Sequence, residues 1–103
     1  MVANSSDFFA LASLKRDKVD VEGQTIHIRE LSVKERAKLL ETVDKEPGMA
    51  SAFLVRCCVT DESGKPLFKD SDTDALASSA PGVVDAVAAA VMRLSGMRND
   101  PNA

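Results

Sequence analysis

The sequence predicts a mostly helical α+β domain, with one N-terminal antiparallel β-hairpin packed against about four helices. Residues 18–31, "KVDVEGQTIHIREL", alternate apolar and polar side chains on both sides of a glycine, which is typical of two half-buried strands. Most of the remaining chain repeats apolar residues three and four apart, which is typical of amphipathic helices. The chain has 103 residues, 45% of them hydrophobic, so we expect one domain over residues 1–103, with a core at about 6–97 and frayed termini.

The first predicted elements are a short helix and the hairpin. Residues 7–14, "DFFALASL", follow two serines, and Ser5 or Ser6 could cap a helix of about two turns. In the hairpin, a two-residue turn at Gly23-Gln24 would place its glycine first, as a type II′ turn requires. Val21 would then face Ile26 and Val19 would face Ile28, with all four side chains on one face of the sheet.

Two helices are predicted in the middle of the chain. Ser32 and Glu35 have the spacing of a capping box, in which each side chain accepts a hydrogen bond from the other residue's backbone N–H. The helix that they open is predicted to end at Pro47-Gly48. Residues 49–59, "MASAFLVRCCV", are apolar nearly all round, which indicates a central, buried helix. The apolar face of the first of these helices is predicted to contain Val33, Ala37, Leu40 and Val43, widened by Leu39.

The C-terminal part is predicted to form a turn and two more helices. Residues 60–68, "TDESGKPLF", are rich in turn-forming residues, with a small hairpin as one reading. A short helix is expected at 73–79, and a longer one at 81–95 that opens with Pro81. The apolar face of this last helix is wider than a small core requires, so part of it is predicted to bind a partner. The candidate contact residues are Val84, Val87, Val91 and Leu94.

The residue types that carry most enzyme chemistry do not form a site in this sequence. His27 is predicted on the outward face of the hairpin, where Asp20 could reach it, but no nucleophile or second base lies nearby. Cys57 and Cys58 are adjacent and are interpreted as two buried thiols, since neighbouring side chains of a helix point in different directions. We therefore predict no catalytic residue and no cofactor.

A metal site is also not predicted. Asp70, Asp72 and Asp74 match the first ligand positions of a calcium-binding EF-hand loop. However, Ala75 stands where that loop needs glycine, and Pro81 stands where it needs a chelating glutamate. The acidic residues are better interpreted as the start of the following helix, where the helix dipole favours carboxylates.

Composition argues against nucleic acid and membranes as partners. The formal net charge is −3 and no basic patch is apparent, so the phosphate backbone of a nucleic acid is not an expected ligand. The longest weakly polar run, residues 83–92, contains Asp85 and is shorter than the ~20 residues that a membrane-spanning helix needs. The N-terminal residues do not have the pattern of a secretory signal.

The order of these parts resembles the tail assembly chaperones of long-tailed bacteriophages. A hairpin like "VDVEGQTIHIRELS" is followed by an amphipathic helix like "SVKERAKLLE" and then by a central helix. The most specific portion is "DESGKPLF", followed by an acidic helix start and a closing helix that ends in "RLSGM". The similarity covers about residues 18–97.

This resemblance implies a non-enzymatic protein that binds the tape measure protein and keeps it soluble while the tail tube assembles. It also implies action in the host bacterial cytoplasm, from a phage or prophage gene, without retention in the mature virion. The tail tube protein and a second copy of the chain are further candidate partners. A small phage adaptor or regulatory domain, such as a head–tail connection factor, is the alternative.

Overall fold

A computed structural model describes residues 2–97, and it confirms a mostly helical α+β domain. In chain order the helices and strands are α1 (Ser5–Leu11), β1 (Arg16–Val21), β2 (Gln24–Arg29), α2 (Val33–Lys45), α3 (Ala50–Cys58), β3 (Val59–Thr60), α4 (Thr73–Ala77) and α5 (Pro81–Leu94). Short 3-10 turns at Pro47–Met49 and Asp70–Asp72 precede α3 and α4. The tail beyond residue 97, which was predicted to fray, lies outside the described residues.

The strands form an antiparallel sheet in the order β1-β2-β3. The third strand was not predicted, because its two residues were assigned to the end of the central helix and to the turn. His27 and Ile28 pair with Thr60 and Val59. The chain then turns back, and Leu67 N–H donates to the Val59 carbonyl oxygen, so the predicted small hairpin is present in residues 59–67.

The predicted hairpin register is wrong by two residues, although the predicted face is right. Val19 pairs with Ile26, and Val21 pairs with Gln24. The turn lies at Glu22-Gly23, where both residues have positive φ, as in a type I′ turn, rather than at Gly23-Gln24. A two-residue shift keeps each side chain on its original face, so the branched side chains of both strands still pack toward the core.

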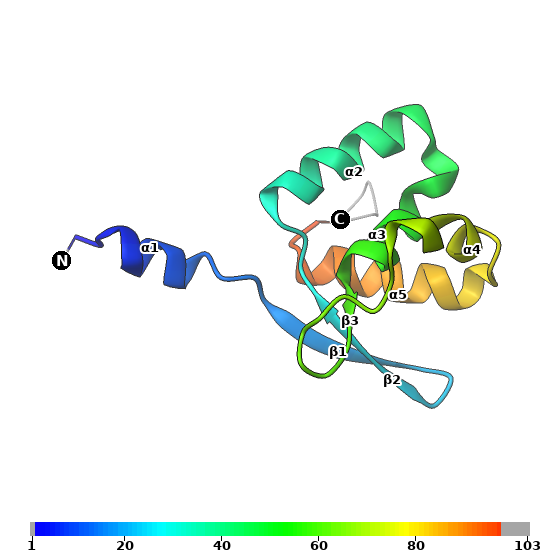
Figure 1. Ribbon diagram of the computed structural model, residues 1–103, viewed down its shortest axis with the longest axis horizontal. Coiled ribbons are helices and arrows are strands. Elements are labelled where there is room, and N and C mark those ends of the chain that lie inside the picture. Colours follow the sequence, from blue (N-terminus) through cyan, green and yellow to red (C-terminus); the bar gives the residue numbers. More distant parts are fainter. Residues whose placement is uncertain (1, 98–103) are drawn as a thin grey trace.

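Helices α3 and α5 form the centre of the core. Figure 1 shows α5 running beneath α3, with α2 above them and α4 beside α3. Six of the nine residues of α3 are buried, as expected for a helix that is apolar nearly all round. The sheet packs against α5 through β1 and β2.

The predicted apolar face of α2 is wrong. Leu39 is its one buried residue, with 2% of its surface exposed. Val33, Leu40 and Val43 are 81%, 58% and 48% exposed. The helix lies at the edge of the domain, so the body covers only the narrow side around Leu39, and the other apolar side chains remain on the surface.

Helix α1 stands away from the rest of the domain (Figure 1). None of its residues is buried, and Asn4 caps it in a capping box with Asp7, in place of the predicted serines. The connection to β1 is anchored at Lys15, whose N–H donates to Glu30 Oε1 and whose carbonyl accepts from the Glu30 N–H. The chain therefore carries an N-terminal arm (residues 2–14) that projects from the body.

Candidate partner-binding surface

The stripe predicted to bind a partner lies mainly in the core. Val91 is fully buried, and Val87 and Val84 are only 3% and 9% exposed. These side chains fill the interface of α5 with α3 and the sheet, because α5 has neighbours on more sides than the sequence pattern suggested. In this fold, Val87 and Val91 are not available to a partner.

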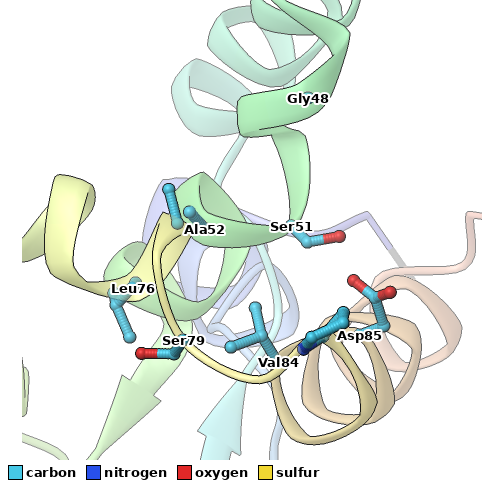
Figure 2. A pocket seen from close by; sticks show the side chains of 9 residues that line it. Gly48, Ser51, Ala52, Leu76, Ser79, Val84 and Asp85 are labelled. Carbon is cyan, nitrogen blue, oxygen red and sulfur yellow. The ribbon is translucent and has the colours of Figure 1, made fainter.

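Two residues of the stripe do reach surface hollows. Val84 lines a hollow of about 240 Å³ beside α4, and Leu94 lines another of about 280 Å³ beside β1. Figure 2 shows the first hollow, with Val84 between Leu76 from α4 and Ser51 from α3. The ends of the predicted stripe are therefore more accessible than its middle.

The hollow of Figure 2 continues into a second one, of about 390 Å³, and we call the two together the central groove. The two hollows share Ser51 and Asp85, which lie between them. The second hollow is formed by α2, α3 and α5, and its lining includes Leu39, Val43, Leu54, Ala88, Ala89 and Met92. The side chains that α5 contributes at Ala88 and Ala89 are small, so another helix could approach α5 closely there. Val43 lines the same hollow from α2.

The central groove has the properties of a helix-binding surface. The lining of its second hollow is largely apolar, whereas that of the first is more polar, and Asp85 is the one ionisable residue that lines either of them. An amphipathic helix could place its apolar side chains over Val43 and Met92 and a basic side chain near Asp85. Sequence reasoning missed this groove because Val43 was assigned to the core, although the small residues "AAA" at 88–90 were a usable signal for close approach.

The strongest charge interaction of the described residues supports the fold and lies outside the central groove. Arg29, at the end of β2, donates from Nη1 and Nη2 to the two carboxylate oxygens of Glu35, at 2.7 and 2.8 Å. This bidentate contact holds the pKa of Glu35 at about 2, helped by the hydrogen bonds from Ser32. The predicted capping box is confirmed, since the Glu35 N–H donates to Ser32 Oγ and the Ser32 N–H donates to Glu35 Oε1.

His27 has different neighbours from those predicted. It is half-buried on β2, opposite Lys18, in an open hollow that Arg16, Asp17 and Lys18 also line. Asp20 pairs instead with Thr25, whose hydroxyl donates to the Asp20 carboxylate at 2.9 Å. The shift of register separates the two groups that could have formed an acid–base pair.

Both cysteines are buried free thiols, as predicted. Burial raises the pKa of Cys57, and it raises the pKa of Cys58 to about 12 despite the nearby Arg29 guanidinium. The thiolate is the reactive form of cysteine, so these two residues are poorly suited to nucleophilic chemistry.

The acidic residues before α4 serve local structure. Asp70 pairs with Arg56 at 2.6 Å, and the Asp72 carboxylate accepts the Lys69 N–H at 2.8 Å. In residues 2–97, no group of three or more histidine, cysteine or acidic side chains could hold a metal ion. No helix in the same range is long and apolar enough to cross a bilayer.

Comparison with known proteins gives a structural relative. No family model matches the sequence, and no curated protein matches it. Among solved structures, the tail assembly chaperone of bacteriophage HK97 matches with a TM-score of 0.65 and 18% sequence identity, over 79% of this chain and 85% of that one. The likeness inferred from the order of sequence elements is thus confirmed at the level of three-dimensional structure: this chain has a phage tail assembly chaperone-like fold.

Proposed function

We propose that this protein is a non-enzymatic phage tail assembly chaperone, which binds the tape measure protein and keeps it soluble while the tail tube assembles. The observation that carries the proposal is the match in fold to the HK97 tail assembly chaperone over most of both chains. The proposed place of action is the host bacterial cytoplasm, and the proposed chaperone leaves before the virion matures. The tail tube protein is a second proposed partner.

The proposal has a physical basis, because a small domain can bind the apolar face of a helix and shield it from water. A long amphipathic helix without a partner exposes an apolar stripe that promotes aggregation. The second hollow of the central groove offers a mainly apolar surface, lined by Val43 and Met92 and by the Asp85 carboxylate. We assign the tape measure contact to this groove, which Val84 of the predicted stripe lines, whereas Leu94 lines a separate hollow beside β1.

The test is co-expression with overlapping fragments of the tape measure protein from the same genome. Wild-type chain should bring at least one fragment into the soluble fraction and co-purify with it. Val43→Glu should lose this activity without unfolding, because Val43 is 48% exposed and a new carboxylate there would stay hydrated. Leu67→Glu is the matched control, since Leu67 is 55% exposed on a loop outside the central groove.

One result would contradict the proposed function, and another would contradict only its assignment to the central groove. In one, wild-type chain leaves every tape measure fragment insoluble and unbound, which would favour an adaptor role with another protein. In the other, Val43→Glu and Leu67→Glu solubilise the fragments as well as wild type does. That second result would remove the central groove from the proposal and leave the contact elsewhere on the surface.

A further inference from the structure

We propose that the first hollow of the central groove is a cation-selecting site, which accepts a lysine or arginine side chain of the helix bound in the second hollow. The inference deepens the proposed function and rests on it, because the occupant is a helical segment of the tape measure protein. It adds a requirement that burial of an apolar face does not impose, namely a basic side chain at a fixed spacing from the apolar ones. The first hollow, of about 240 Å³, can receive the end of one long side chain.

The two hollows of the central groove differ in polarity. The second is lined mainly by apolar side chains from α2, α3 and α5. The first contains the polar side chains of Ser51, Ser79 and Asp85. A helix with a purely apolar face would fill the second hollow and would leave the polar groups of the first without a partner, which costs free energy where water is excluded. The occupant that suits both hollows therefore carries a polar group beside its apolar stripe.

The charge of that polar group follows from the acceptors in the first hollow. Figure 2 shows the Ser51 hydroxyl and the Asp85 carboxylate on the same side of the hollow, one from α3 and the other from α5. No ion pair among residues 2–97 includes Asp85. The Ser79 hydroxyl already donates to the Ala75 carbonyl oxygen, so it retains only acceptor capacity. These groups match an ammonium or guanidinium group, which is charged and donates only.

The spacing of residues along α5 sets the pattern that the occupant needs. Asp85, Ala89 and Met92 follow one another at intervals of four and three residues, so they lie on one face of α5 and line the second hollow together. Asp85 and Met92 are about 10.5 Å apart along the helix axis. A helix that runs along α5 would therefore carry its basic residue seven positions from the apolar residue that contacts Met92. The small side chain of Ala89 between them lets the two helices approach closely.

Asp85 is free to serve a partner because it has no evident role in the fold. It is exposed, whereas its neighbours Val84 and Val87 carry the packing of α5 against the core. Asp85 is also the fifth residue of α5, so it lies beyond the first turn, where the helix dipole favours carboxylates. Stabilisation of the helix start is thus a weak explanation for an acidic side chain at this position.

The first test measures the affinity of the full chain for a labelled synthetic peptide, the shortest tape measure segment that binds it. Asp85→Asn should weaken binding by ~5-fold, as expected for a partly exposed ion pair. Asp85→Lys should weaken it by ~10-fold or more, because it brings like charges together. Salt should weaken wild-type binding more than binding of Asp85→Asn.

Glu62→Lys is the matched control for the charge reversal. It changes the net charge as much as Asp85→Lys does, at an exposed loop position that lines neither hollow. Its affinity for the peptide should stay close to that of wild type. The thermal midpoints of all three variants should also stay close to that of wild type, because both acidic side chains are exposed.

The second test exchanges the charges of the two partners. Each lysine or arginine of the peptide is replaced singly by glutamate, and one position, seven residues from an apolar residue, should dominate the loss of binding to wild type. The same substituted peptide should recover binding to Asp85→Lys, since the contact again joins opposite charges. Moving that basic residue by two positions places it on another side of the helix and should weaken binding as much as its removal.

The outcomes separate this inference from the function on which it rests. Failure of every tape measure segment to bind wild type would overturn both. A segment that binds wild type and Asp85→Lys equally well, or that contains no basic residue, would leave the proposed function in place and reject the cation-selecting site. Equal losses with Glu62→Lys and Asp85→Lys, or no recovery on charge exchange, would show only long-range attraction and would reject the site as well.

Discussion

At the scale of single residues, Arg29 and Glu35 link three elements. Arg29 closes β2, Glu35 lies in the first turn of α2, and the Arg29 guanidinium also lies 4.0 Å from the sulfur of Cys58 at the end of α3. The Arg29 and Glu35 side chains are 19% and 25% exposed, so solvent screens their attraction only in part. Because Glu35 also completes the capping box, one carboxylate both starts α2 and fixes it to the sheet.

This carboxylate predicts an acid-sensitive contribution to stability. The pKa of Glu35 is about 2 in the folded chain, against an ordinary value of 4.5. As the pH falls, Glu35 is therefore protonated in the unfolded chain before it is protonated in the folded chain. The ionised Glu35 carboxylate stabilises the fold fully above pH 4.5. That contribution is lost as the pH falls toward 2. At about 1.4 kcal/mol per pKa unit, and allowing for partial exposure, it amounts to about 2 to 3 kcal/mol.

Urea denaturation of wild type and Glu35→Gln across this range would measure the effect. The difference in unfolding free energy between the two proteins should be largest near neutral pH and should shrink below pH 4.5. Exposed carboxylates such as Glu41 remain in both proteins, so the difference isolates Glu35. A difference that stays constant from neutral pH to pH 2 would show that the Glu35 charge contributes nothing to stability.

At the scale of elements, local sequence signals predicted the helices well, but they predicted the strand register and the strand β3 poorly. The capping box at Ser32 and Glu35, Pro81 at the start of α5 and the glycine after its end act within one turn of helix, so the sequence shows them directly. The register of the hairpin depends on which two residues form its turn. Here Glu22 adopts a positive φ of 50°, a conformation that sequence rules assign to glycine or asparagine. The two-residue strand β3 is too short to give a periodic pattern at all.

The candidate binding surface was hard to predict for a related reason. Periodicity shows that a helix face is apolar, but it does not show whether the domain or a partner covers that face. On α5 the face around Val91 is covered by α3 and the sheet, whereas on α2 the face around Val43 is left open. The number of neighbours that surround each helix decides between these cases, and that number is a property of the whole fold.

The α5 stripe gives a direct test of this assignment. Val91→Glu should destabilise the domain by about 3 to 5 kcal/mol, because it places an unpaired charge at a fully buried site. Ala86→Glu, on the exposed side of the same helix, should leave the thermal midpoint almost unchanged. If Val91→Glu melts as wild type does, then Val91 is not in the core, and the stripe could serve a partner as the sequence suggested.

At the scale of the whole molecule, the chain divides into a body with a continuous core and an arm that adds nothing to it. The core joins β2, α2, α3, β3 and α5, while residues 2–14 contribute no buried side chain. The arm gives the described chain its elongated outline, with extents of 49 × 31 × 30 Å. The arm is therefore expected to add little to the stability of the body.

Deletion of residues 2–14 tests this division. The variant should unfold in urea with the midpoint and the slope of wild type. The slope is the sharper observable, because it scales with the surface that unfolding exposes, and no side chain of the arm is buried. Lys15 must be kept, since its two hydrogen bonds to Glu30 hold the start of β1 against the segment that leads into α2.

As the matched control, a deletion extended through Val19 should lower the midpoint clearly, because it removes β1 residues that pair with β2 and a side chain that packs on the core. If loss of residues 2–14 alone lowers both midpoint and slope, the arm packs on its own body in solution and contributes to its stability.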